Sequence, residues 1–151
     1  MVRGISFEIP QKATDSLWKI LSAIDVSKYF WYVIENQTEA WNSSYENDFF
    51  GQRCYDGQDF IKCIQQDQHI VFLKIEAYLS PQTFQNIPSY RAFMKSDCQF
   101  VLLIYDCKYV ELYIKDYAIL NSVFNRVKSL GYYNANFITD LNDNRTEMNV
   151  L

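Results

Sequence analysis

The stretch from residue 98 to residue 115 constrains the fold more than any other part of the chain. Residues 100–105 are six apolar or aromatic residues without a break, a pattern typical of a strand covered on both faces. Residues 109–115 alternate instead, with Val110, Leu112 and Ile114 on one side, which indicates a strand with one solvent-exposed face. The three residues between them are too few for a parallel crossover. We therefore predict an antiparallel hairpin inside a sheet, with the rest of the chain packed on it.

A helix is predicted directly after this hairpin. Asp116 stands where its carboxylate can accept hydrogen bonds from the first free N–H groups of a helix. The apolar positions of residues 117–130 recur every three or four residues, and Gly131 can adopt the left-handed conformation that ends a helix. The spacing predicts a long helix that lays one face on the sheet.

Shorter patterns predict the other elements of the fold. Strands are expected at 3–9, 29–35, 39–42, 69–79 and 134–139, and helices at 15–24, after Asp56 and after Ser89. In the strand at 69–79, Lys74 and Glu76 alternate with apolar residues, which indicates one solvent-exposed face. We expect a single α+β domain over residues 1–151, in which one mixed, mostly antiparallel sheet of five to six strands carries two long helices.

The charge balance excludes several classes of partner. The formal net charge is −4, and no window gathers basic residues into a stripe that could neutralise phosphates. The longest apolar runs, residues 29–34 and 100–105, are far shorter than the roughly 20 residues of a membrane helix. Arg3, Ser6 and Glu8 interrupt the apolar core that a signal peptide would need. We expect a cytoplasmic protein that binds neither nucleic acid nor membranes, and the sequence does not set its oligomeric state.

The chain lacks the residue patterns of known cofactor, metal and catalytic sites. The 4 glycines are dispersed, so neither a phosphate loop nor a dinucleotide fingerprint can form. The 4 cysteines stand in two pairs with a spacing of nine, unlike zinc sites, and we interpret them as small buried hydrophobes. His69 is the only histidine, and a structural role in a strand is favoured over a role as general base. We expect no cofactor and no metal, and the sequence favours a protein without catalysis.

One candidate binding site follows the last predicted strand. Asp140, Asp143 and Arg145 form a dense polar cluster that could contribute to a cation site or pair with an incoming basic group. The ligand pattern of a calcium loop is missing. The alternative is a solvated or capping turn.

A second candidate binding site is the polar loop that follows the strand at 29–35. Glu35, Glu39 and Glu46 flank Trp41, and a ring surrounded by acids could meet a basic protein partner. The alternative is that Trp41 is folded into the core.

Several short stretches, spread over most of the chain, carry a family resemblance. They are residues 3–10 (RGISFEIP), 96–98 (SDC), Asp106, residues 110–115 (VELYIK), residues 138–140 (ITD), 142–143 (ND) and 145–146 (RT). In these stretches the chain resembles a domain of unknown function found in small uncharacterised proteins of spore-forming Gram-positive bacteria. The resemblance implies a bacterial cytosolic protein and supplies no catalytic residues.

Two hypotheses of different classes remain for the function. The first is a non-catalytic protein-interaction module, similar to small acidic immunity proteins, whose polar loops present acids and aromatic rings to a basic partner. The second is a small-molecule-binding protein or enzyme with a pocket rich in tyrosine, since the chain contains 12 of them. A flat acidic patch with an exposed Trp41 would favour the first hypothesis, and a deep apolar pocket with converging polar groups would favour the second.

Overall fold

The computed structural model describes residues 1–151 and contains one antiparallel sheet of eight strands. The strands are β1 (Val2–Glu8), β2 (Phe30–Val33), β3 (Glu39–Asn42), β4 (Cys54–Tyr55), β5 (Gln68–Tyr78), β6 (Cys98–Tyr105), β7 (Tyr109–Ile114) and β8 (Tyr133–Thr139). The helices are α1 (Ser16–Leu21), α2 (Gly57–Ile64), α3 (Tyr90–Lys95) and α4 (Tyr117–Ser129), with short 3-10 turns η1 (Val26–Lys28), η2 (Glu35–Gln37) and η3 (Pro81–Thr83). The strand order is β4-β2-β5-β6-β7-β1-β8, and β3 also pairs with β5. None of the helices is long and apolar enough to cross a membrane.

The predicted hairpin is confirmed and lies at the centre of the sheet. β6 pairs with β7 in the register Leu103 to Glu111, and its other edge pairs with β5. Asp106 and Cys107 both have positive φ angles, 52° and 67°. Two successive left-handed residues give the tight turn whose twist matches that of the flanking strands.

β2 and β3 lie end to end along one edge of β5. Val33 pairs with Ile75, and Glu39 pairs with Phe72 further along the same strand. The short turn η2 separates β2 from β3, so the two strands together form one interrupted strand antiparallel to β5.

Three of the four predicted helix starts are confirmed by side-chain caps, whereas Asp15 before α1 makes no capping hydrogen bond. Asp56 accepts a hydrogen bond from the N–H of Asp59 at 2.8 Å, and Asp116 accepts one from Ile119 at 3.1 Å. Ser89 accepts one from Ala92 at 3.2 Å, so the short helix α3 forms where it was expected. Each cap satisfies one of the free N–H groups at a helix start.

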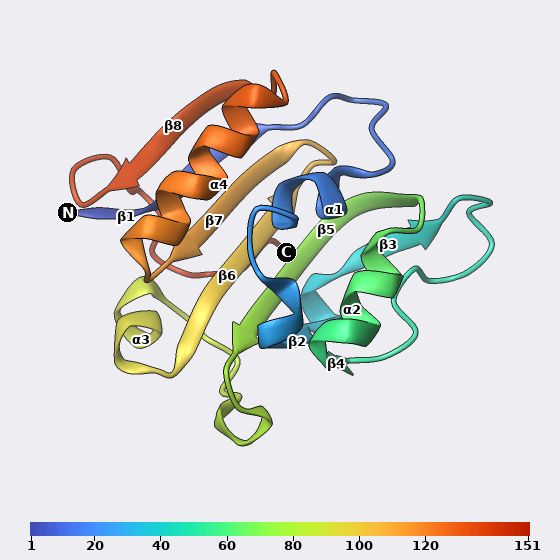
Figure 1. Cartoon of the computed structure of the whole chain (residues 1–151), viewed down its shortest axis with the longest axis horizontal. Helices are drawn as coiled ribbons and strands as arrows, with labels where there is room; N and C mark the ends of the chain where they lie inside the picture. The colour runs from blue at the N-terminus through green and yellow to red at the C-terminus, as the bar shows by residue number, and fades with distance from the viewer.

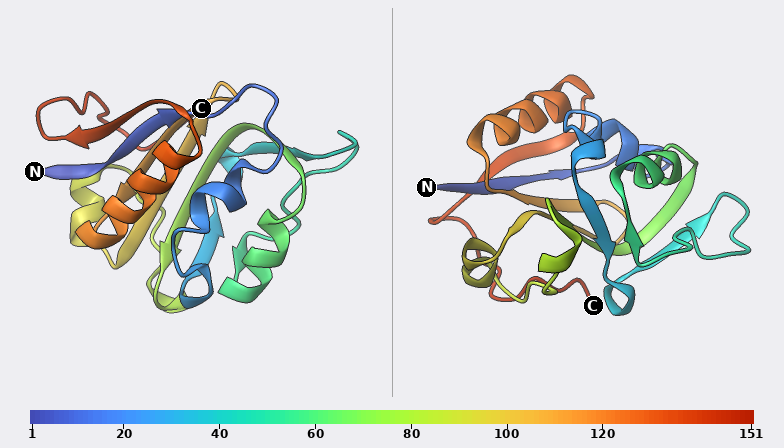
Figure 2. Two further views of the ribbon diagram at one scale, coloured as in Figure 1. Left: turned by 45° about the horizontal axis from the view of Figure 1, so that its top comes forward. Right: turned by 60° about the horizontal axis from the view of Figure 1, so that its bottom comes forward.

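The sheet is covered on both faces. Helices α1, α2 and α4 cover the face that we call the first face, over a core that includes Leu102, Ile104 and Trp31 (Figure 1). Helix α3, the loop before it and the C-terminal residues cover the opposite, second face, over a smaller core that includes Val101 and Leu103 (Figure 2, right). The expectation that β6 is buried on both sides is therefore correct, since these residues are at most 1% exposed.

The predicted mixed sheet of five to six strands with two long helices is wrong. Every strand pair is antiparallel, and β4, of two residues, is too short to show a strand period in the sequence, whereas β3 forms at 39–42 where a strand was expected. The helix expected at 15–24 covers only Ser16–Leu21, because Ile24 and Val26 reach the core through a turn and η1. Only α2 and α4 exceed six residues.

The solvent-exposed face predicted for β5 is also wrong. Lys74 and Glu76 are 1% and 0% exposed. The Lys74 Nζ donates to the carbonyl of Ile87 at 2.5 Å and to Asn86 Oδ1 at 3.2 Å. Glu76 accepts from the N–H of Ile87 at 2.6 Å and from the hydroxyl of Tyr78 at 2.7 Å. Lys74 Nζ and Glu76 Oε2 are also 3.5 Å apart. Through their hydrogen bonds to Asn86 and Ile87, the two side chains hold the loop of residues 84–88 on the second face.

The cysteines are all free, and their environments differ from the interpretation as buried hydrophobes. Only Cys98 is buried, Cys63 is partly exposed, and Cys54 and Cys107 are exposed. Burial raises the pKa of the Cys98 thiol to about 12. The interpretation therefore holds for Cys98 alone.

The substitution Leu103→Ala tests the central position of β6. Leu103 is fully buried on the second face, so removing its side-chain methyl groups should lower the free energy of unfolding by about 2 to 5 kcal/mol. Denaturant titration measures the change. A loss below about 0.5 kcal/mol, the usual size at surface positions, would contradict the burial of β6 on this face.

Candidate functional site

The floor of the candidate site is the second face of strands β7, β1 and β8. Ser6 of β1 lies opposite Glu111 of β7 on one side and Asn136 of β8 on the other. Glu8 lies opposite Tyr109 in the next row. Directly opposed residues of antiparallel strands share a face, so these side chains form two adjacent polar rows that run across the strands. Within a row, neighbouring strands are about 4.8 Å apart.

Residues 140–151, which we call the C-terminal strap, cross the second face without regular secondary structure (Figure 2, right). The Met148 side chain is 1% exposed and belongs to the smaller core, and its N–H donates to the carbonyl of Pro88 at 2.9 Å. The N–H groups of Val150 and Leu151 donate to Gln37 Oε1 at 2.7 and 3.0 Å. The strap thus extends from the end of β8 to η2.

Arg145 attaches the middle of the strap to the sheet. Its Nε and Nη2 donate to the two carboxylate oxygens of Glu111 at 3.2 and 2.7 Å. Its Nη1 donates to the carbonyl of Asn149 at 2.7 Å, and the guanidinium lies 5.5 Å from the ring centre of Tyr105. Burial lowers the pKa of Arg145, but Glu111 outweighs this effect and leaves the pKa raised. This is a bidentate ion pair in a largely covered place, which fixes both side chains.

Arg3 attaches the beginning of the strap. Its Nε donates to Asp140 Oδ1 at 2.8 Å and its Nη1 donates to Asp143 Oδ2 at 3.1 Å. The hydroxyl of Tyr113 donates to Asp143 at 3.2 Å. The hydrogen bond from Arg3 holds the pKa of Asp140 below its ordinary value. Both aspartates therefore form ion pairs with a cation of the protein itself, the guanidinium of Arg3.

A groove lies between the strap and the two polar rows. Its volume is about 1020 Å³, and it is open to solvent. Side chains of the sheet and of the strap line it, among them Ser6, Glu8, Tyr105, Tyr109, Glu111, Asn134, Asn136, Asn144, Arg145, Thr146, Glu147 and Asn149. Phe7 and Val110 also border it, but their side chains belong to the first-face core, so they contribute mainly backbone. The groove is polar, with two tyrosines on its floor.

The titratable side chains that line the groove are carboxylates, tyrosines and one arginine. Its lining contains no histidine and no cysteine, and His69 lies on β5 beside β3, where Tyr45 stacks on it at 4.0 Å. Burial raises the pKa of Tyr105, and the charge of Glu111 raises it further. Both effects favour the protonated form of this tyrosine.

The residues predicted from the acidic loop lie in a different place. Glu35 forms an ion pair with Arg53 and borders a smaller hollow of about 310 Å³. Trp41 is partly buried on β3 opposite His69, and Glu39 is exposed two residues before it. Gln37, which receives the end of the strap, lies between Glu35 and Glu39 in the chain.

The predicted cluster at residues 140–145 does border the groove. Asp143 and Arg145 line it, whereas Asp140 pairs with Arg3 and with the amino group of Met1 at 3.4 Å. Sequence reasoning missed Ser6, Glu8 and Glu111, because only the strand pairing brings them to this cluster. Their alternation with apolar residues was the available signal that they share the polar face of their strands.

The comparisons with known proteins place the chain in a family. The family described as protein of unknown function (DUF2691) matches residues 2–149. The chain belongs to this family. It is 29% identical over 158 residues to the uncharacterized protein YncE of Bacillus subtilis (strain 168), a match that covers 99% of this chain and 100% of the relative. No solved structure matches the chain. The resemblance to a bacterial family of unknown function is thereby confirmed.

A double-mutant cycle on Arg145 and Glu111 tests the attachment of the strap. Arg145→Gln and Glu111→Gln should each lower the free energy of unfolding by about 1 to 3 kcal/mol, because each leaves the other charge without its partner in a covered place. The double variant should lose clearly less than the sum of the two, with a coupling of about 1 kcal/mol or more. Additive losses in denaturant titration would show that the pair does not form.

Proposed function

We propose that this protein is a non-catalytic binding protein and that its ligand occupies the groove between the C-terminal strap and the sheet. The observation that carries the proposal is a groove of about 1020 Å³ whose floor and wall come from separate strands and from the strap. Sites that bind ligands are concave, and a few polar groups in them fix the orientation of the ligand. The groove is concave and has about the size of such a site, and its lining is more polar than is usual for one.

The arrangement of charges supports binding over catalysis. Arg145 donates hydrogen bonds to both carboxylate oxygens of Glu111. Glu8 accepts from Asn134 at 2.6 Å and lies 3.5 Å from the Nζ of Lys108. A carboxylate that acts as acid, base or nucleophile must be available to the substrate, and these two carboxylates of the floor are engaged by other groups of the protein.

The groove differs from both sites considered for the sequence. It is neither a deep apolar pocket nor a flat acidic patch, and Trp41 is only partly exposed.

A cytoplasmic location is part of the proposal, and the four free thiols support it, because thiols stay reduced in that compartment.

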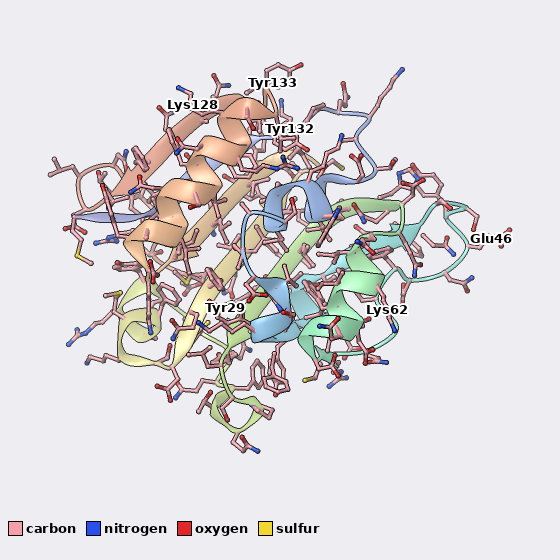
Figure 3. All side chains as sticks on the ribbon, viewed as in Figure 1. Tyr29, Glu46, Lys62, Lys128, Tyr132 and Tyr133 are labelled. Carbon is pink, nitrogen blue, oxygen red and sulfur yellow. The ribbon has the colours of Figure 1, made fainter.

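A second candidate function is binding of a basic protein through the projection formed by residues 39–48. This segment contains Glu39, Glu46 and Asp48 and no Lys or Arg, and Tyr45 is 63% exposed on it. Figure 3 shows that Glu46 lies at the outer end of the projection, away from the body of the protein. Acids and exposed rings at such a place suit a basic partner, whose capture should weaken as salt rises.

One binding experiment tests both candidates. The wild-type protein and three variants, Tyr109→Ala, Trp41→Ala and the control Tyr117→Ala, are immobilised and exposed to fractions of a bacterial lysate that contain small molecules, glycans, peptides and proteins. Tyr117 is an exposed residue of α4 on the first face, whereas the groove lies on the second face. Mass spectrometry identifies what is retained.

We expect a ligand that the wild type and Tyr117→Ala retain and that Tyr109→Ala loses, because a ring in the centre of a site commonly contributes about 2 kcal/mol. Loss in Trp41→Ala alone, with retention that falls at high salt, would support the projection in place of the groove. A ligand retained equally by all variants would contradict both candidates.

A further inference from the structure

The charged groups of the groove restrict the chemistry of its ligand. Glu111 is paired with Arg145, Glu8 lies beside Lys108, and Asp143 is paired with Arg3 at 3.1 Å. A charged ligand on the floor of the groove would have to break one of these pairs to gain an opposite charge, which would leave the other member of the pair unpaired. Glu147, which is exposed on the wall, is the one lining carboxylate without a cation. The arrangement therefore favours a ligand without net charge.

The uncharged groups of the groove offer hydrogen bonds in both directions. The hydroxyls of Ser6 and Thr146 and the amide of Asn144 face it without a partner in the protein. The Nδ2 of Asn136 donates a hydrogen bond to the carbonyl of Asn134 at 3.0 Å, which leaves the Oδ1 of Asn136 available to a ligand. Hydroxyls and amides can donate and accept, so they suit a ligand that itself carries many hydroxyl groups.

Two tyrosines supply an apolar contact next to these groups. The rings of Tyr105 and Tyr109 are 5.3 Å apart at an angle of 28°, and both side chains are partly exposed. An aromatic ring has a negative face, which attracts the slightly positive C–H groups of a sugar ring. Lys108 lies over the Tyr109 ring at 4.9 Å from its centre and Arg145 lies over the Tyr105 ring at 5.5 Å, so a sugar unit would contact the remaining exposed part of each ring.

The shape of the groove distinguishes a sugar from a peptide. Peptide recognition by extended segments needs pockets for side chains, and apolar pockets are absent from the floor because the apolar residues of β1 and β7 point to the other face. The volume of about 1020 Å³ lies at the upper end of small-ligand sites, so it accommodates more than one sugar unit. Within one polar row, side chains on neighbouring strands are about 4.8 Å apart, which is close to the length of one pyranose unit.

We infer that the groove binds a neutral oligosaccharide, with its sugar rings on Tyr105 and Tyr109 and its hydroxyls on Ser6, Asn136 and Asn144. This inference rests on the proposed function of the groove. It names the ligand class of that same site.

The test is a calorimetric titration of the full chain with short neutral oligosaccharides built from glucose, xylose, mannose or N-acetylglucosamine. Anionic oligogalacturonates and a library of unstructured peptides are titrated in parallel. We expect a neutral oligosaccharide to bind, and Tyr109→Ala and Asn136→Ala each to weaken it about tenfold, the effect of losing about 1.4 kcal/mol. Binding should change little with salt, because no charge is recognised.

Two matched controls accompany these variants. Tyr117→Ala and Asn125→Ala remove the same side chains from exposed positions on α4, and they should bind like the wild type. Asn136 is exposed, so Asn136→Ala should fold normally and keeps the test valid if Tyr109→Ala does not.

The other outcomes separate the inference from the proposed function. Binding of a peptide or an anionic sugar that depends on Tyr109 and Asn136, without binding of any neutral oligosaccharide, would overturn the inference and leave the groove as the site. Binding that depends on neither residue would overturn both. Shortening of the oligosaccharide during incubation would contradict the non-catalytic function while supporting the ligand class.

Discussion

The burial of β6 on both faces is the constraint on which the rest of the structure depends. Leu102 and Ile104 point to one side and Val101 and Leu103 to the other, and all four are almost completely buried. A sheet with two apolar faces must be covered twice, since either face left in water would lose the hydrophobic stabilisation of its core. Helices α1, α2 and α4 supply the first cover. The second cover is built mainly of irregular chain, and for that reason it needs side chains to hold it.

The irregular cover also explains why a groove exists. The loop of residues 84–88 is held by Lys74 and Glu76, and the strap is held by Arg3, Arg145, Met148 and Gln37. The loop is attached over the centre of the sheet, and the strap is attached at its beginning, its middle and its end. The flank formed by β7, β1 and β8 is left with polar rows under an open hollow. The same ion pairs that fix the strap also neutralise the groove, so stability and ligand chemistry share residues such as Glu111 and Arg145.

The local parts of this account could be predicted from the sequence, and the long-range parts could not. The hairpin, the caps at Asp56 and Asp116 and the last strand follow from patterns within a few residues. The burial of Lys74 and Glu76 depends on a loop whose Asn86 is 12 positions from Lys74, and the pair of Arg145 with Glu111 spans 34 positions. Gln37 and Val150 are 113 positions apart. In the candidate site, Asp143 and Arg145 were predicted as a polar cluster, but their partners come from strand pairing, which the sequence pattern does not determine.

Hydrogen exchange of the strap amides tests the central claim most directly. The N–H groups of Met148 and Val150 donate to Pro88 and Gln37, so in the wild-type protein they should exchange at least about tenfold more slowly than in an unstructured peptide. In Arg145→Gln this protection should fall while Leu102 in β6 stays protected. Exchange of Met148 and Val150 at the rate of an unstructured peptide in the wild type would contradict the account, because the second face would then lack its cover and the groove its wall.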